Sequence, residues 1–313
     1  MRRLTSLLAA ASGAPPEGEV WTGDDAAIVA RPEGRVVLCC DAAVEGVHAD
    51  LSLVGLDDLG WKAVTATVSD VGAVGGRPCH VLLTVCSPPG TDLDRLARGA
   101  AEASTRWGCP VVGGDVTASS QLMVSAAAIG VLDGPAPPVL RSGATAGDTL
   151  VVTGPLGASS AGLRLLRAGA RGENADAGVL AGDAARAELV RAHRRPEARL
   201  AEGVAARAAG ARAMIDVSDG LAIDLHRMAE ASKVGVALDG VPVAEGATEE
   251  EALAGGEDYE LLVATPDPDR LAATFADLGL RPPIVVGRCT GDVAERTLRG
   301  GALTRRGFEH RLA

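Results

Sequence analysis

The chain has 313 residues, of which 47% are hydrophobic and only 2% aromatic, and its formal net charge is −11. We expect no nucleic-acid partner for so acidic a chain, because nucleic-acid-binding surfaces carry clustered basic residues. The length suggests two domains, and an interior of Val, Leu, Ile and Ala suits buried strands covered by helices.

Strand-like apolar runs and helical patterns alternate along the chain. The expected strands lie at residues 35–40, 80–86, 122–132, 149–154, 235–239 and 259–266. The expected helices lie at residues 57–74, 93–107, 159–168, 184–209 and 221–232. This alternation predicts an α/β (α+β) fold. Because the Pro- and Gly-rich segment 133–148 interrupts every pattern, we expect an N-terminal domain at 1–138 and a C-terminal domain at 139–313.

Two features bear on the cellular location. The first fourteen residues, MRRLTSLLAAASGA, look like a short signal peptide, but Thr5 and Ser6 interrupt a brief apolar part, so we expect an amphipathic helix. No other stretch is long and apolar enough to cross a membrane, and we expect no membrane partner. The six cysteines contain no C-x-x-C pair and lie mostly in apolar runs, which predicts buried free thiols in a reducing cytosol.

Carboxylates gather in six short motifs that are dense in Gly and Ala. The motifs are TGDDAAIV (Asp24, Asp25), CCDAAVEGVH (Asp41), TVSDVGAVGG (Asp70), VVGGDVTAS (Asp115), IDVSDGLAIDL (Asp216, Asp219, Asp224) and LAGGEDYELL (Glu257, Asp258). Any one of them could be a helix cap or an Asx-turn. Six together favour a cation site, because clustered carboxylates repel one another and Mg²⁺ binds through carboxylates and substrate phosphates.

The usual phosphate-binding motifs are absent. The sequence contains no G-x-x-x-x-G-K-[ST] motif, and its only lysines are Lys62 and Lys233. The segment GPLGASSAG could cap an anion at the start of a helix, and Arg141 could make a forked phosphate contact. We interpret residues 193–203, HRRPEARLAEG, as a Pro-initiated helix with its basic residues exposed. Trp61 is expected to pack rather than to bind a ligand.

In order along the chain, these motifs resemble the thiamine-monophosphate kinase family. The family lies in the superfamily of aminoimidazole-ribonucleotide synthetase and selenophosphate synthetase. The resemblance covers residues 23 to about 287 and includes GDDAAIV, DAAVEGVH, LGWKAVTATVSDVGAVGGRP, VVGGDVTAS, RSGATAGDTLVVTGPLG, MIDVSDGLAIDL and ALAGGEDYEL. Relatives share SDGL and GGEDYEL, whereas VEGVH and LGWKA favour the thiamine enzyme.

The resemblance implies ATP-dependent phosphorylation of thiamine monophosphate to thiamine diphosphate by direct in-line transfer, assisted by several Mg²⁺ ions. It also implies an α/β N-terminal domain whose sheet pairs with its twin in a homodimer, and an α+β C-terminal domain. ATP would lie in the cleft between the domains. The acceptor phosphate is largely ionised near neutral pH, so the reaction needs positioning and charge neutralisation rather than a general base.

The resemblance implies a role for individual residues as well. The metal ligands would be Asp25, Cys40, Asp41, Asp70, Asp115, Asp216 and Asp219. Asp70 would be the most central, and Asp70, Asp216 and Asp219 would be catalytic. ATP would contact Gly114, Asp115, Arg141 and Ser218. The thiamine substrate would contact His48, Glu257 and Phe308.

Three alternatives remain. Cys39 and Cys40 stand where the family usually has hydroxyl residues, and a thiol is a poor Mg²⁺ ligand, so either the Cys40 carbonyl coordinates or zinc binds at Cys40, Asp41 and His48. A selenophosphate-synthetase-like enzyme should carry a reactive Cys or selenocysteine near a lysine, and neither residue precedes residue 23. A catalytically silent nucleotide-binding scaffold would have no need for so many acidic motifs.

Overall fold

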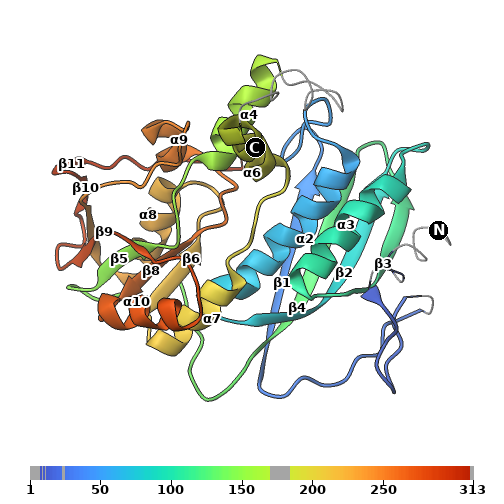
Figure 1. Cartoon of the computed structure of the whole chain (residues 1–313), viewed down its shortest axis with the longest axis horizontal. Coiled ribbons are helices and arrows are strands. Elements are labelled where there is room, and N and C mark those ends of the chain that lie inside the picture. The colour runs from blue at the N-terminus through green and yellow to red at the C-terminus, as the bar shows by residue number, and fades with distance from the viewer. Residues whose placement is uncertain (1–7, 9, 11, 23–24, 170–183, 311–313) are drawn as a thin grey trace. The chain divides into compact units, whose positions relative to one another are not determined.

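The computed structural model describes residues 8, 10, 12–22, 25–169 and 184–310 (Figure 1). These residues form two compact units. The N-terminal unit holds the described residues of Met1–Val71, Arg77–Gly134 and Gly169–Val179. The C-terminal unit holds the described residues of Gly72–Gly76, Pro135–Ala168 and Leu180–Ala313. Both units combine strands with helices, so the predicted α/β (α+β) class is confirmed.

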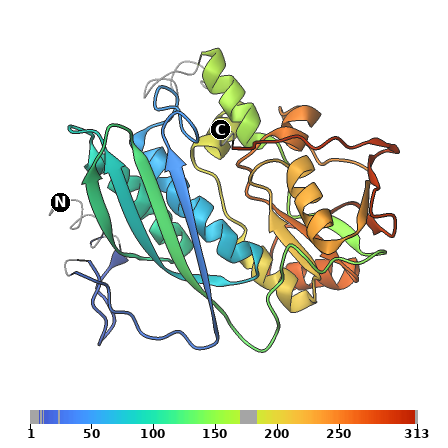
Figure 2. The ribbon, with the colours of Figure 1, turned by 180° about the vertical axis from the view of Figure 1, so that it is seen from behind.

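The N-terminal unit is built on a four-stranded sheet in the order β1-β4-β2-β3. Its strands are β1 (Arg35–Val44), β2 (Arg77–Ser87), β3 (Val111–Ala118) and β4 (Met123–Leu132). β4 is antiparallel to both β1 and β2, whereas β2 and β3 are parallel. The helices α2 (Leu56–Ala73) and α3 (Leu93–Trp107) cover one face of the sheet, and Figure 2 shows the opposite face.

Side chains alternate between the two faces of this sheet, as the two-residue period of a strand requires. On β4, Val124, Ala126 and Ala128 are buried, whereas the residues between them are half-buried. On the face away from α2 and α3, Leu38 of β1 is 72% exposed and Leu82 of β2 is 40% exposed. We call this side of the sheet, which is turned away from α2 and α3, the exposed face.

The two helices of this unit pack with their backbones in close contact. A Cβ at Gly99 of α3 would lie 1.7 Å from the carbonyl oxygen of Asp57 in α2, so only glycine fits there. Trp61 of α2 is buried, and its ring centroid lies 6.2 Å from that of Trp107. The prediction that Trp61 packs is therefore confirmed.

The C-terminal unit is built on a seven-stranded sheet in the order β11-β10-β7-β9-β5-β8-β6. The strands are β5 (Thr149–Val152), β6 (Ala213–Asp216), β7 (Gly235–Leu238), β8 (Leu261–Thr265), β9 (Ile284–Thr290), β10 (Arg296–Leu298) and β11 (Gly301–Ala302). The helices are α4 (Ala158–Ala168), α6 (Ala184–Arg194), α7 (Leu200–Ala209), α8 (Leu221–Ser232), α9 (Glu249–Ala254) and α10 (Pro268–Asp277).

This second sheet has a hydrophobic core on each face. Leu150 and Leu262 point into a core that contains Leu225 of α8. Their chain neighbours Val151 and Leu261 belong to a separate core formed with α7 and α10. Strands that are buried on both faces read as continuous apolar runs, which explains why TLVVTG and YELLVATP were recognisable in the sequence.

The chain between residues 184 and 209 forms two helices, so the single helix predicted there is wrong. α6 ends at Arg194 and α7 begins at Leu200. Pro196 lies between them; it has no backbone N–H and disfavours a helical conformation at the residue before it. The prediction of a Pro-initiated helix with exposed basic residues is wrong as well, because His193 is buried and the Arg199 side chain is only 24% exposed.

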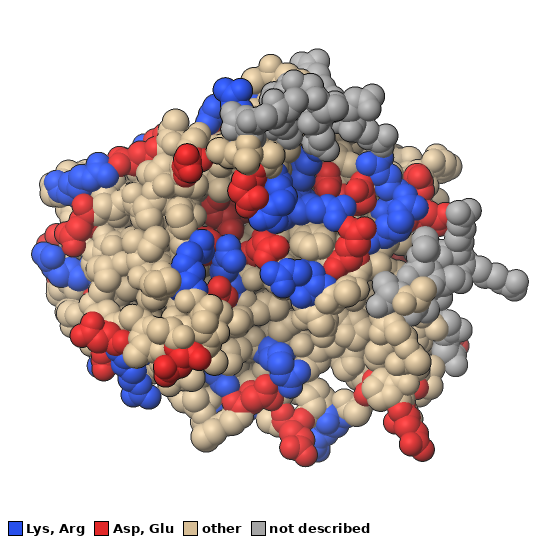
Figure 3. Space-filling model, in the orientation of Figure 1, with Lys and Arg blue, Asp and Glu red and all other residues tan. Residues whose placement is uncertain are grey.

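None of the described helices is long and apolar enough to cross a membrane. Most of the opening segment for which an amphipathic helix was predicted lies outside the described residues. All six cysteines are free thiols, as predicted, but only Cys109 and Cys289 are buried. Cys40 is exposed and the other three are half-buried, so the prediction of burial is wrong for these four. On the face shown in Figure 3, acidic side chains lie among basic ones.

Candidate active site

In the N-terminal unit, β1 and α2 bring together Cys39, Asp41 and Asp70. The Cys39 thiol donates to the carbonyl oxygen of Thr67 in α2 at 3.1 Å, so the Cys39 side chain faces α2. Asp41 lies two residues along the strand and therefore faces the same way. Burial, together with the nearby charges of Asp70 and Asp41, raises the pKa of Cys39 to about 12. Asp41 and Asp70 are thus close enough to influence the same group.

The neighbouring Cys40 points to the opposite side of β1. Its sulfur lies 3.4 Å from the Ser125 hydroxyl, and the residue is exposed. Consecutive strand residues face opposite sides of a sheet, so the thiol of Cys40 and the carboxylate of Asp41 do not converge. This separation speaks against the zinc alternative and leaves only the Cys40 backbone available to an ion that Asp41 binds.

Gly114 and Asp115 lie on β3, at the far edge of the sheet from β1. A Cβ at Gly114 would lie 1.9 Å from the Leu83 carbonyl oxygen, and the φ angle of Gly114 is +152°, so only glycine fits at this position. Asp115 is exposed, and one of its carboxylate oxygens accepts from the Thr117 hydroxyl at 3.1 Å. Three strand spacings separate Asp115 from Asp41, a distance of roughly 14 Å.

His48 and Asp25 lie in loops of the N-terminal unit, where His48 is half-buried and Asp25 is exposed. The Nδ1 atom of His48 accepts from the backbone N–H of Val44 at 3.1 Å, so the neutral ring carries its proton on Nε2. Asp24, the neighbour of Asp25, lies outside the described residues. The roles of His48 and Asp25 stay predictions.

In the C-terminal unit, Asp216 ends β6, and the loop between β6 and α8 carries Ser218 and Asp219. Asp216 is buried at the end of β6. Arg227 of α8 donates to Asp219 at 2.5 Å and to the buried Asp224 at 2.7 Å, and Asp224 also accepts from the backbone N–H of Asp219 at 3.0 Å. Burial raises the pKa of Asp224 to about 7. Asp224 and Arg227 therefore hold the loop in place, and Arg227 balances the charge of Asp219.

The GGEDYE segment runs beside this loop in a strained conformation. The backbone N–H of Glu257 donates to the Ser218 carbonyl oxygen at 2.7 Å. Glu257 and Tyr259 have φ angles of +67° and +50°, which non-glycine residues rarely adopt and which are common at ligand sites. The backbone N–H of Phe308 donates to the Asp219 carbonyl oxygen at 2.9 Å. Four predicted site residues, Ser218, Asp219, Glu257 and Phe308, are thus brought together.

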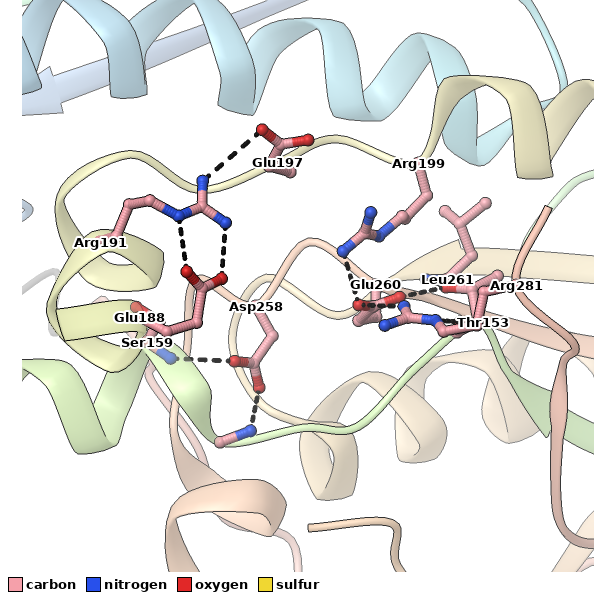
Figure 4. A network of polar contacts seen from close by, with 11 residues as sticks. Thr153, Ser159, Glu188, Arg191, Glu197, Arg199, Asp258, Glu260, Leu261 and Arg281 are labelled. Carbon is pink, nitrogen blue, oxygen red and sulfur yellow. Dashed lines mark hydrogen bonds and ion pairs between the residues drawn. The ribbon is translucent and has the colours of Figure 1, made fainter. Parts of the chain in front are cut away.

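The start of α4 binds the carboxyl group of Asp258, a residue of the chain itself. Its carboxylate accepts from the backbone N–H groups of Gly157 at 2.6 Å and Ser159 at 3.2 Å (Figure 4). A helix N-terminus favours a negative charge, and this one is already satisfied. The GPLGASSAG segment therefore binds a carboxyl group of the protein itself. The anion site that the sequence suggested is already occupied by this side chain.

The buried carboxyl of Asp258 predicts a pH effect on stability. Burial raises its pKa from 3.8 to about 7. Between pH 4 and 7 the folded protein therefore binds more protons than the unfolded chain, and the free energy of unfolding falls as the pH rises, by up to about 1.4 kcal/mol per pH unit. The free energy of unfolding, measured by denaturation across this pH range, should decline less steeply in Asp258→Asn than in the wild type. Parallel curves would contradict the prediction.

A second buried carboxylate, Glu260, gathers three donors. Glu260 accepts from the Thr153 hydroxyl at 2.6 Å, from Arg199 at 2.9 Å and from Arg281 at 2.7 Å (Figure 4). The Thr153 hydroxyl oxygen accepts from the backbone N–H of Leu261 at 2.8 Å. This network ties the end of the GGEDYE segment to β5, to the start of α7 and to the segment after α10. The sequence alone gave no signal for it.

Arg141 lies away from Ser218, the other ATP contact predicted for this unit. It is exposed, and its carbonyl oxygen accepts from the hydroxyl of Ser232 at the end of α8. Ser218 precedes the start of the same helix, which has 12 residues and is therefore about 18 Å long. The structure does not bring Arg141 and Ser218 together, so one ligand would have to extend along α8 to reach both.

The carboxylates fit a hard cation better than zinc. Across the described residues, no three His, Cys, Asp or Glu side chains are arranged so that they could hold a metal ion. The thiol of Cys39 is bonded to a backbone carbonyl, and that of Cys40 faces away from Asp41. The donors that remain are carboxylate oxygens, which Mg²⁺ prefers.

Two domain families match the chain. Residues 23–132 match the family described as "AIR synthase related protein, N-terminal domain", and residues 145–298 match "AIR synthase related protein, C-terminal domain". Together they cover the first sheet, every strand of the second sheet except β11, and both acidic loops of the C-terminal unit. The chain is an AIR synthase related protein with the two-domain fold of that class.

More similar proteins within this class identify the family of this chain. A thiamine-monophosphate kinase of Mycobacterium tuberculosis is 38% identical over 262 residues, which cover 79% of this chain and 74% of that protein. The structure of thiamine-monophosphate kinase from Stenotrophomonas maltophilia K279a has a TM-score of 0.83 at 29% identity and covers 96% of both chains. AaThiL complexed with AMPPCP and TMP has a TM-score of 0.77 at 30% identity, with 92% and 91% of the two chains covered. This chain belongs to the thiamine-monophosphate kinase family.

The family and enzyme class predicted from the motifs are thereby confirmed. Sequence reasoning missed three residues that shape the site: Arg227, Glu260 and His193. Arg227 follows Asp224 by three residues on α8, a spacing that places two side chains on the same helix face and was therefore visible in the sequence. Glu260 and His193 act through contacts with distant residues, which no local pattern reveals.

Proposed function

We propose that this protein transfers a phosphoryl group from ATP to thiamine monophosphate and so produces thiamine diphosphate. One observation carries the proposal: the SDGL loop, the strained GGEDYE segment and Phe308 meet in the C-terminal unit. The related structure of AaThiL was obtained with AMPPCP and TMP, which supports the same pair of ligands here.

Mg²⁺ would be held by the carboxylates, and it would neutralise the charge of the two phosphate groups when bound. The residues proposed as ligands are Asp25, Asp41, Asp70, Asp115, Asp216 and Asp219, together with the backbone of Cys40. Arg227 balances Asp219 until a cation competes for that carboxylate. Asp70, Asp216 and Asp219 are proposed as the residues nearest the reacting phosphates.

The remaining residues position the two substrates. Gly114, Asp115, Arg141 and Ser218 are proposed to contact ATP. His48, Glu257 and Phe308 are proposed to contact the thiamine substrate. The acceptor is a phosphate oxygen that is already ionised near neutral pH, so no side chain has to remove a proton from it.

A homodimer in the cytoplasm completes the proposal. The exposed face carries Leu38 at 72% and Val36 at 49% exposure on β1, a strand at the edge of its sheet. An exposed apolar sheet face is a surface that a second copy can cover by packing its own sheet against it. The free thiols support a reducing compartment.

A turnover assay tests the proposal. The protein is incubated with ATP, Mg²⁺ and thiamine monophosphate, and thiamine diphosphate is measured directly; omission of Mg²⁺ with added EDTA is the control. We expect product only when all three are present. Absence of thiamine diphosphate while selenide or a purine precursor is phosphorylated would place the chain elsewhere in the superfamily. Absence of all three activities would favour the silent scaffold.

A further inference from the structure

His193, in the last turn of α6, lies between the first turn of α4 and the GGEDYE segment. It is only 6% exposed. Its Nδ1 atom lies 3.2 Å from the Ser159 hydroxyl oxygen and 3.6 Å from a carboxylate oxygen of Glu257. A buried imidazole thus touches a residue proposed to contact the thiamine substrate.

The backbone around His193 fixes the position of its ring. A Cβ at Gly162 of α4 would lie 2.0 Å from the Leu189 carbonyl oxygen and 3.0 Å from the His193 Cβ, so α4 and α6 are in close backbone contact. Ser159 is itself held, because its backbone N–H donates to Asp258. The imidazole is therefore anchored by two helices, and it meets Glu257 from a fixed direction.

The geometry does not place Ser159, His193 and Glu257 in series as a proton relay. A nucleophile, a base and an acid in series would use both ring nitrogens, one for each neighbour. Here Ser159 and Glu257 both approach Nδ1. The contact can instead restrain the direction of the Glu257 carboxylate, whose side chain is 27% exposed and whose backbone is held at a φ angle of +67°.

We propose that His193 is a positioning residue that orients the Glu257 carboxylate for the thiamine substrate. The inference rests on the proposed function, in which Glu257 contacts thiamine monophosphate. Thiamine carries a cationic ring and an amino group, and both are suitable partners for a carboxylate that is held in place. His193 would then affect how well the thiamine substrate binds without affecting how ATP binds.

Two variants of similar polarity test this role. In His193→Asn, the amide can lie near the position of Nδ1, whereas in His193→Gln it lies near that of Nε2. We expect His193→Gln to raise KM for thiamine monophosphate by about tenfold, because the polar contact between Nδ1 and the Glu257 carboxylate is lost, with little change in KM for ATP or in kcat. His193→Asn should retain a KM near that of the wild type. Equal and unchanged KM values in both variants would overturn the proposal.

A double-mutant comparison tests whether His193 acts through Glu257. When Glu257 is already replaced by Ala, adding His193→Gln should cause no further increase in KM for thiamine monophosphate. An increase of the same size in both backgrounds would mean that His193 acts independently, and it would overturn the proposal.

A second buried histidine provides the matched control. The ring of His226 bonds to the Ala222 carbonyl oxygen within α8, and His226→Gln should leave the KM for thiamine monophosphate unaltered. An equal rise in the His226 and His193 variants would assign the effect to lost packing and overturn the inference. If the wild type makes no thiamine diphosphate, the proposed function is wrong. The role of His193 is then tested by the affinity for thiamine monophosphate, measured by direct binding to the wild type and to His193→Gln.

Discussion

Replacing Asp70 with Asn is expected to lower kcat for phosphoryl transfer by about a thousandfold, comparable to the loss of a main charge-stabilising group in other enzymes. The substitution keeps the shape of the side chain and removes its charge. Asp70 lies on α2 in the same charged neighbourhood as Asp41, where it influences Cys39. A neutral amide there would bind a divalent cation weakly, and the two phosphate groups would repel each other with less compensation.

The fold should survive this change. α2 is held by buried apolar residues such as Val64, Val68 and Val71, whereas Asp70 is only half-buried. Circular dichroism and thermal unfolding should therefore match the wild type while thiamine diphosphate production is lost. Asp133→Asn is the matched control, because Asp133 is an exposed acid of the same unit that pairs with Arg77. The Asp133→Asn enzyme should be as active as the wild type. Near-normal turnover in Asp70→Asn would rule out a carboxylate scaffold for the metal.

Several elements were predictable because their signal is local. The apolar runs at 35–40, 122–132 and 149–154 became β1, β4 and β5, since a strand buried on at least one face needs such a run. β3 was missed because two glycines interrupt VVGGDVTA, and β6 was missed because the whole strand, AMID, is only four residues long. In both cases the neighbouring strands, rather than local propensity, decide the conformation.

The motifs predicted which acidic residues form the proposed site, but the directions of their side chains could be predicted only in part. Cys40 and Asp41 are adjacent on a strand, so the two-residue period already implied that their side chains diverge. The hydrogen-bond partners of Asp258 could not be predicted in this way. The backbone N–H groups of Gly157 and Ser159 are distant in the chain and come next to Asp258 only when α4 packs against the GGEDYE segment. Contacts of that kind depend on the fold and leave no periodic trace in the sequence.

Glu260→Ala is expected to lower the free energy of unfolding of the C-terminal unit by about 3 kcal/mol, the lower end of the range for breaking a buried ion pair. The carboxylate is 5% exposed and is the shared acceptor of Arg199 and Arg281. Its removal leaves two guanidinium groups facing each other and deprives the Thr153 hydroxyl of its acceptor. The arginines are 24% and 41% exposed, so water can stabilise them in part, which keeps the loss at the lower end.

Glu260→Gln should cost less than Glu260→Ala, because an amide oxygen can still accept from Thr153 while the charge is lost. Glu188→Ala is the matched control: Glu188 pairs with Arg191 at 61% and 49% exposure, and such a surface pair contributes less than about 1 kcal/mol. Urea unfolding followed by circular dichroism should rank the variants with Glu188→Ala nearest the wild type, then Glu260→Gln, then Glu260→Ala. If Glu260→Ala proved as stable as Glu188→Ala, the buried carboxylate would not be holding β5, α7 and the GGEDYE segment together.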